Sequence, residues 1–197
     1  MELPENLNLI GVVLAGGKSS RMGVDKAELS ISGKSMLLRT QELLTEVGAR
    51  EVIICRNEPG YVADIYPHSG PVGGIYSALE HLLSSNPQSL LTKKLNALLI
   101  VPIDMPLLDK DTLIELTCCG AQMYSPLSYN EQQFPLFLPL SEEVRDCARA
   151  VVTGSGRSMT SFLNFIGCAS ITTTKELPFL NTNNPAQWQA AIEQLNS

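Results

Sequence analysis

The segment 14–26 brings small residues and cations together in a way that suits phosphate binding. It reads Leu-Ala-Gly-Gly-Lys-Ser-Ser-Arg-Met-Gly-Val-Asp-Lys and directly follows a short apolar run. Small residues at such a turn let backbone N–H groups approach phosphate oxygens, and neighbouring cations balance the phosphate charge. The segment therefore predicts a loop that binds an anionic, phosphorylated ligand. Its cations are Lys18, Arg21 and Lys26.

This loop differs from the two commonest phosphate-binding motifs. A P-loop would need a glycine five residues before Gly17, where the chain has Val12. The dinucleotide fingerprint also fails, because the glycines at 16, 17 and 23 do not have the G-x-G-x-x-G spacing. Taken alone, the loop leaves the identity of the ligand open.

Asp104 is a further candidate for a chemical role. It follows the apolar run 97–101, so its carboxylate would face a cleft at the C-terminal end of a buried strand. Mg²⁺ typically takes one or two protein carboxylates and completes its shell with phosphate oxygens and water. Asp104 alone would suffice for such a site, although a turn residue before Pro106 is the structural alternative. Asp109 and Asp111 suit a helix-capping role better.

The elements that must position these residues alternate in type. We expect strands at 9–14, 51–55 and 97–101, and helices at 35–47, 73–83 and 112–118, with Gly48 as a helix C-cap. Three strand–helix repeats favour βαβ units with right-handed crossovers. The fold class is therefore α/β: a single three-layer, Rossmann-like domain whose mostly parallel sheet is covered by helices on both faces.

The second half of the chain has a less regular pattern. Expected strands lie at 136–138 and 169–172, and expected helices at 158–166 and 185–195, the last with Asn184 as N-cap and Pro185 at its first position. The polar stretch 84–94 is predicted to be a surface loop rather than a linker. We therefore treat residues 1–197 as one domain, with a first part at about 1–110 that contains the segment 14–26 and Asp104, and a second part at about 111–197.

Composition excludes several classes of protein. The 197 residues carry a formal net charge of -6, which argues against nucleic acid or an anionic membrane as a partner. There is neither an apolar run long enough to cross a bilayer nor a basic signal-peptide start, so the expected location is the cytoplasm. The five cysteines contain no Cys-x-x-Cys pair, and we interpret them as buried or incidental thiols rather than a disulfide framework or zinc site.

Four segments together resemble one enzyme family. The first, Leu-Ala-Gly-Gly-x-Ser-x-Arg-Met-Gly-x-Asp-Lys, looks like the signature of the molybdenum cofactor guanylyltransferases, within the nucleoside triphosphate transferase superfamily. Three further segments resemble that family's motifs in the same order along the chain. They are Gly70-Pro71-Val72-Gly73-Gly74-Ile75, Asp104-Met105-Pro106 and Asn181-Thr182-Asn183-Asn184-Pro185.

The resemblance implies a role for each matching residue. Arg21, Lys26 and Asp104 would be catalytic, with Asp104 also holding Mg²⁺. Nucleotide-binding residues would be Leu14, Ala15, Gly16, Gly17, Lys26, Asn57, Asp64, Gly70, Gly73 and Asp104. Acceptor-binding residues would be Asn181 and Asn183, to which we add Arg157 because an exposed loop arginine suits phosphate recognition.

The chain departs from the family pattern at three places. Cys55 stands where the family often has an asparagine against the nucleotide, and Asn57 lies two residues further on. Asn184 replaces the usual threonine, and Phe134 precedes Pro135 where histidine or glutamine is common. These differences bear on pterin recognition and on the ribose contact.

The resemblance implies transfer of GMP from GTP to the terminal phosphate of molybdenum-molybdopterin, with release of pyrophosphate. GTP and the molybdenum-loaded pterin would be the small-molecule partners, and the resemblance also allows transient contact with cofactor-biosynthesis proteins or apo-molybdoenzymes. The alternatives are a cytidylyltransferase for the same pterin, which usually reads Leu-Ala-Ala-Gly in the first loop, or another small-molecule guanylyltransferase. A non-enzymatic alternative is a degenerate nucleotide-binding domain with a regulatory role.

Overall fold

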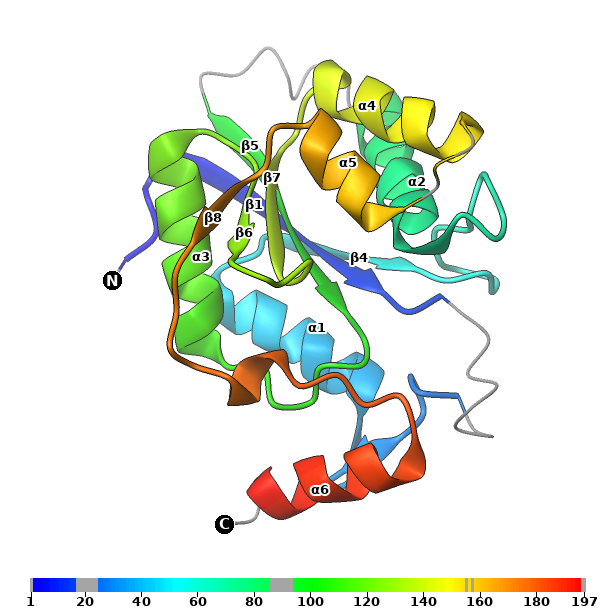
Figure 1. Ribbon diagram of the computed structural model, residues 1–197, viewed down its shortest axis with the longest axis vertical. Helices are drawn as coiled ribbons and strands as arrows, with labels where there is room; N and C mark the ends of the chain where they lie inside the picture. Colours follow the sequence, from blue (N-terminus) through cyan, green and yellow to red (C-terminus); the bar gives the residue numbers. More distant parts are fainter. Residues whose placement is uncertain (1, 17–24, 86–93, 155, 157, 196–197) are drawn as a thin grey trace.

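The structure is a computed structural model that describes residues 2–16, 25–85, 94–154, 156 and 158–195. A central six-stranded sheet has helices on both faces (Figure 1). The strands are β1 (Leu7–Leu14), β4 (Glu51–Cys55), β5 (Leu95–Pro102), β6 (Leu127–Tyr129), β7 (Leu136–Pro139) and β8 (Ala169–Ile171), with β2 (Ser30–Ile31) and β3 (Lys34–Ser35) forming a separate hairpin. The helices are α1 (Met36–Val47), α2 (Gly70–Ser85), α3 (Lys110–Met123), α4 (Glu142–Thr153), α5 (Met159–Phe165) and α6 (Pro185–Leu195), with a short 3-10 helix, η2 (Leu177–Phe179).

The sheet is mostly parallel, as the sequence predicted. Its strand order is β4-β1-β5-β7-β6-β8, and only β7 runs against its neighbours. β1 is parallel to both β4 and β5, and Leu14 is in register with both Cys55 and Pro102. Because these three strands end together, the segments that follow them meet at one edge of the sheet.

Each face of the sheet packs against its own group of helices. α1 and α3 cover one face, and α2, α4 and α5 cover the other (Figure 1). The inward side chains of β1 alternate between the two resulting cores: Leu9 and Val13 face the first, and Ile10 and Val12 the second. This two-sided burial explains why the strands are almost continuously apolar.

Local end signals correctly located several helices. Gly48 ends α1 with φ 112°, and Asn184 Oδ1 accepts a hydrogen bond from Gln187 N (3.0 Å) at the start of α6. Asp109, rather than Asp111, caps α3, because its Oδ1 accepts from Thr112 N at 2.7 Å. The predicted helices 35–47, 158–166 and 185–195 are confirmed to within a residue at each end.

Other expected boundaries were wrong. α3 continues to Met123 rather than ending at 118, and α2 spans Gly70–Ser85 rather than 73–83. Ser84 and Ser85 therefore belong to a helix and not to the predicted loop 84–94, whose residues 86–93 lie outside the described chain. α4 and β6 were not predicted, although Ser141 caps α4 and two glutamates follow it.

Candidate functional site

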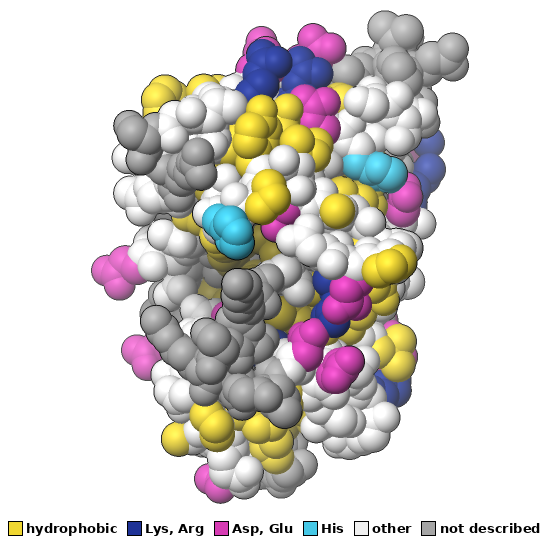
Figure 2. Space-filling view, turned by 90° about the vertical axis from the view of Figure 1, so that its right-hand side faces the viewer, with side chains coloured by type: hydrophobic (Ala, Val, Ile, Leu, Met, Phe, Trp, Pro, Cys, Tyr) yellow, Lys and Arg dark blue, Asp and Glu magenta, His cyan; other side chains and the backbone are white. Residues whose placement is uncertain are grey.

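A pocket of about 630 Å³ lies where β1, β4 and β5 end. The face that carries these strand ends is seen in Figure 2, where acidic side chains gather around recessed basic atoms. The pocket is enclosed by segments that follow the three strands and by the start of α2. Its lining is Leu14, Ala15, Gly16, Asp25, Lys26, Cys55, Arg56, Asn57, Glu58, Asp64, Pro67, His68, Gly70, Pro71, Gly74, Pro102, Ile103 and Asp104.

Backbone hydrogen bonds extend the sheet into the pocket wall. Ala15 N donates to Cys55 O (3.0 Å), and Ile103 N donates to Leu14 O (3.1 Å). The predicted nucleotide-binding residues Leu14, Ala15 and Gly16 therefore line the pocket on a fixed backbone. Gly17, Lys18 and Arg21, which the sequence placed in the same loop, lie outside the described residues.

Lys26 and Asp104 meet across the pocket. Lys26 Nζ lies 3.1 Å from Asp104 Oδ2 and donates to Asn183 Oδ1 at 2.8 Å. Both charged side chains are largely covered, with exposed fractions of 16% and 24%. An ammonium and a carboxylate at this depth form a charge pair that a phosphate and a divalent cation can join from the pocket side.

The C-terminal segment is tied to the same place. The backbone N–H and the hydroxyl of Thr182 both donate to Asp104 O, at 2.8 and 3.2 Å, and Thr182 is buried. Asn183, a predicted acceptor-side residue, thereby reaches Lys26, whereas Asn181 is exposed and does not line the pocket. Arg157 lies outside the described residues.

Asn57 and Asp64 form a reciprocal pair on another wall. Asn57 Nδ2 donates to Asp64 Oδ2 (3.1 Å), and Asp64 N donates to Asn57 Oδ1 (2.7 Å). The Asp64 carboxylate faces two glycines, because a Cβ added at Gly16 or Gly74 would lie 3.9 Å from one of its oxygens. The carboxylate and two bare backbone positions therefore share one corner of the pocket.

The start of α2 points toward this pocket. Gly70, with φ 62°, and Gly74 line it, and the positive end of the helix dipole favours an anionic ligand there. Gly73 does not line the pocket and instead leaves room for neighbouring chain, because a Cβ on it would lie 3.2 Å from Tyr66 O.

Cys55 contacts backbone rather than offering a nucleophile. Its buried Sγ donates to Gly74 O at 3.4 Å. Burial, and secondarily the nearby Asp64 carboxylate, raise the pKa of the Cys55 thiol to about 12. The thiol is therefore neutral at physiological pH, and Asn57 is the amide of this strand end that lines the pocket.

Sequence reasoning missed Arg56. This arginine directly follows β4, is only 7% exposed, and binds both Asp25 and Glu58 on the pocket wall. The available signal was a cation at the end of a buried strand, at the same sheet edge as the predicted loop. His68, which no sequence motif singled out, also lines the pocket and has φ 66°.

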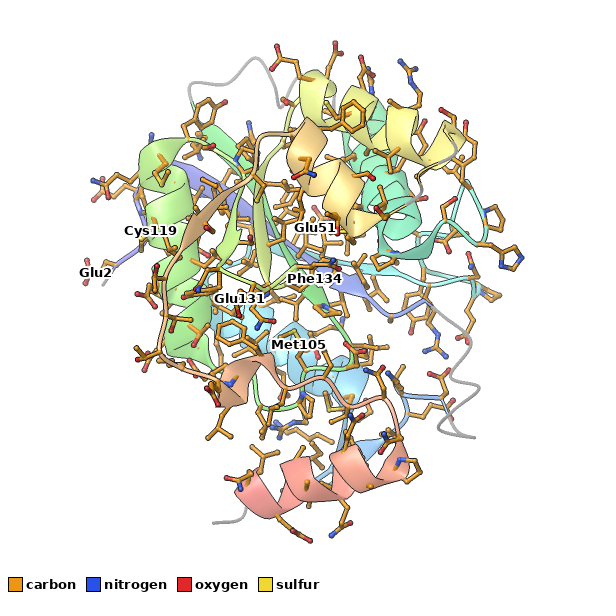
Figure 3. All side chains as sticks on the ribbon, viewed as in Figure 1. Glu2, Glu51, Met105, Cys119, Glu131 and Phe134 are labelled. Atoms are coloured by element: carbon orange, nitrogen blue, oxygen red, sulfur yellow. The ribbon has the colours of Figure 1, made fainter. Side chains whose placement is uncertain are left out.

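Phe134 is placed in the core rather than in this pocket. It is half-buried and packs against both hydrophobic cores, with Met105 labelled nearby in Figure 3. The Phe134–Pro135 peptide bond is cis. At the position where the family commonly has a polar side chain, this protein therefore has a packing residue.

Two features are absent from the described residues. Within those residues, no helix is both long and apolar enough to cross a membrane. The same part of the chain holds no group of three or more His, Cys, Asp or Glu side chains that could bind a metal ion.

Comparison with known proteins gives a consistent result. Residues 11–166 match the MobA-like NTP transferase domain. A molybdenum cofactor guanylyltransferase from Xanthomonas euvesicatoria pv. vesicatoria is 34% identical over 190 residues, which cover 93% of this chain and 94% of the relative. One from Sinorhizobium fredii is 30% identical over 208 residues, covering 94% and 91%.

A solved structure shares the fold. The molybdopterin-guanine dinucleotide biosynthesis protein A of Archaeoglobus fulgidus superposes with a TM-score of 0.71 at 16% identity, over 95% of this chain and 98% of that one. The pocket at the strand ends, the extent of the domain match and the full-length relatives lead to one conclusion: the chain belongs to the family of MobA-like nucleoside triphosphate transferases.

Proposed function

We propose that this protein transfers GMP from GTP to the terminal phosphate of molybdenum-molybdopterin, giving molybdopterin guanine dinucleotide and pyrophosphate. The observation that carries the proposal is the Lys26–Asp104 pair in a pocket at the ends of β1, β4 and β5. Full-length relatives that bear the name molybdenum cofactor guanylyltransferase support the choice of substrates.

The reaction needs positioned charge rather than a protein nucleophile. An oxygen of the acceptor phosphate attacks the α-phosphorus of GTP, and the bond from that phosphorus to the bridging oxygen of the β-phosphate breaks. The acceptor is already anionic at neutral pH, so no base must remove a proton. Lys26 would offset negative charge that builds on phosphate oxygens in the transition state, and we propose that Arg21 acts with it.

The donor set of the pocket fits Mg²⁺. Asp104 presents one carboxylate, of which Oδ2 contacts Lys26. Phosphate oxygens and water would supply the other ligands, which is how Mg²⁺ is usually held beside nucleotides. The bound ion would withdraw charge from the phosphates, while Asp104 would orient it and Lys26 would keep the carboxylate in place.

Asp64 supports guanine over cytosine. Guanine offers N1–H and its 2-amino group as adjacent donors, which match the two oxygens of one carboxylate. Neutral cytosine would instead place the acceptors N3 and O2 toward the same group. We therefore propose that Asp64, facing Gly16 and Gly74, binds the base, with Leu14 and Ala15 along its edge.

We divide the chain between the two substrates. Among the residues that the structure describes, those that line the pocket fall between 14 and 104, which supports nucleotide binding by residues 1 to about 110. Residues from about 111 to 197, including Asn181, Asn183 and Arg157, would then receive the pterin phosphate. We propose that the reaction takes place in the cytoplasm. We also propose transient contact with cofactor-biosynthesis proteins or apo-molybdoenzymes.

The test supplies the purified protein with molybdenum-loaded pterin, Mg²⁺ and either GTP, CTP or ATP, and identifies the dinucleotide by mass. We expect product with GTP alone, and its loss in Asp104→Asn but not in Asp111→Asn, a control on the exposed first turn of α3. Product from CTP would refute the choice of base. Nucleotide binding without any product or pyrophosphate would refute the enzymatic assignment.

A further inference from the structure

The side chain of Arg56 joins two segments of the pocket wall. Its Nη2 lies 2.5 Å from Asp25 Oδ2 and 2.6 Å from Glu58 Oε1, and its Nη1 lies 3.4 Å from Asp25 Oδ1. The side chain is 8% exposed, whereas those of Asp25 and Glu58 are 37% and 50% exposed. A buried guanidinium therefore holds two carboxylates that are themselves partly exposed to solvent.

The backbone of Arg56 is itself fixed. Its N–H donates to Val62 O (2.9 Å), and its carbonyl accepts from Glu58 N (2.9 Å). It also directly follows Cys55, which is in register with Leu14 of β1. The guanidinium thus extends toward Asp25 from a backbone that is fixed at the edge of the sheet.

Asp25 transmits this restraint to Lys26. Its Oδ1 accepts a hydrogen bond from Ala27 N at 2.9 Å. This bond closes a turn that has Lys26 between the two bonded residues. Glu28 N also donates to Asp25 O (3.1 Å). The turn that presents Lys26 to Asp104 and Asn183 is therefore held from the side by Arg56.

The same contact controls the charge that a nucleotide would meet. Asp25 and Glu58 line the pocket, and two unpaired carboxylates there would repel a triphosphate. The hydrogen bonds that Arg56 donates to Glu58 and to Asp25 outweigh burial and raise the pKa of Arg56 above its already high value. The guanidinium stays charged across the working pH range and compensates part of their charge.

We propose that Arg56 is a positioning residue that acts through Asp25 to fix the Lys26 ammonium for nucleotidyl transfer. The inference rests on the proposed function. It requires arginine specifically, because a planar guanidinium can engage two carboxylates on separate segments, whereas a lysine ammonium is a point charge on a flexible stem. Arg56 therefore contributes geometry to a reaction that Lys26 carries out.

The test compares Arg56→Met and Arg56→Lys with Arg145→Met. Arg145 is a matched control, because it is also a largely buried arginine, 21% exposed, that pairs with two carboxylates, Glu80 and Asp146, away from the pocket. Steady-state kcat and KM for GTP are measured per folded protein, at a temperature well below each variant's unfolding midpoint. A purely structural role would leave kcat per folded molecule unchanged.

We expect Arg56→Met to lower kcat by about 10²-fold, as displacement of a reacting group by about 1 Å can do. Arg56→Lys should lose less kcat and raise KM less than Arg56→Met does. It keeps the positive charge but lacks the planar guanidinium that can bind both carboxylates. Arg145→Met should retain wild-type kcat. A wild-type kcat in Arg56→Met would overturn the inference.

A second variant covers the case in which Arg56→Met does not fold. Asp25→Asn keeps an acceptor for Ala27 N but loses the charge that holds Arg56. In the double variant, the losses of kcat from Asp25→Asn and Arg56→Lys should not add, because both substitutions break the same Arg56–Asp25 interaction. Additive losses would overturn the route through Asp25. Failure of the wild-type protein to form dinucleotide would refute the proposed function instead.

Discussion

Lys26→Met separates catalysis from stability at this site. The substitution removes an ammonium 3.1 Å from Asp104 Oδ2 and 2.8 Å from Asn183 Oδ1, while it keeps most of the aliphatic stem. In the resting protein the pair is partly solvated, and such salt bridges contribute about 0–1 kcal/mol. For a chain of this size we therefore expect the unfolding midpoint to fall by at most about 4 °C.

We expect the transition state to depend on the same ammonium much more strongly. A positioned donor facing charge that develops on oxygen is worth about 2.7–4 kcal/mol, which corresponds to about 10²–10³ in kcat. The ratio of the two effects decides the role of Lys26. A large loss of rate beside a small loss of stability is expected only if the ammonium acts on the reacting phosphates.

Single-turnover conversion of GTP to dinucleotide, with enzyme in excess, measures the chemical step, and thermal unfolding measures stability. Lys34→Met is the control, because Lys34 pairs with Glu42 on the exposed side of the β3–α1 junction. It should retain both the rate and the melting temperature. A loss of rate below about tenfold in Lys26→Met would refute the reasoning, since it lies well under the contribution of a charged transition-state donor.

Two further predictions concern the scaffold. A Cβ at Gly120 would lie 2.5 Å from Phe137 Cγ, so Gly120→Ala should lower the unfolding free energy by about 1–3 kcal/mol in urea titration; adding Phe137→Leu should recover part of that loss, and strictly additive losses would contradict the clash. Burial, then its hydrogen bond to Glu115, raises the pKa of Tyr129, whose hydroxyl also donates to Thr112 O. This stabilisation is complete below the unfolded-state pKa of about 10 and is lost as pH rises toward the folded-state value. Tyr129→Phe should therefore lose stability less steeply than wild type between about pH 9 and 11, and parallel pH profiles would contradict the assignment.

The parts of the fold that the sequence predicted well have local causes. Alternating apolar strands and helices define the first three βα repeats, and residues such as Gly48 and Asn184 mark helix ends by their own hydrogen bonds or backbone angles. The predicted C-terminal end of α3 was wrong, and the reason involves a residue far away in the sequence. The helix continues past Gly120, which has no side chain and therefore makes room for Phe137 of β7.

The candidate site was predictable as a set of residues but not as a set of contacts. Ala15, Asn57, Asp64 and Asp104 all line the pocket, since each follows a strand that ends at the same sheet edge or lies in the loop after it. The partner of Lys26 on the last segment could not be found from spacing, because Asn183 is 157 positions away. Pairings over such distances depend on the completed sheet.

These long-range contacts connect the two halves of the chain at Asp104. Its carboxylate contacts Lys26 of the N-terminal half, while its backbone carbonyl accepts hydrogen bonds from both donors of Thr182 in the C-terminal segment. Thr182 is buried, so the C-terminal segment is packed against the domain at this point. If the acceptor binds along the C-terminal segment, we expect its phosphate and the α-phosphate of GTP to meet at Asp104. Such convergence is what an in-line transfer without a covalent enzyme intermediate requires, because orientation then supplies much of the rate.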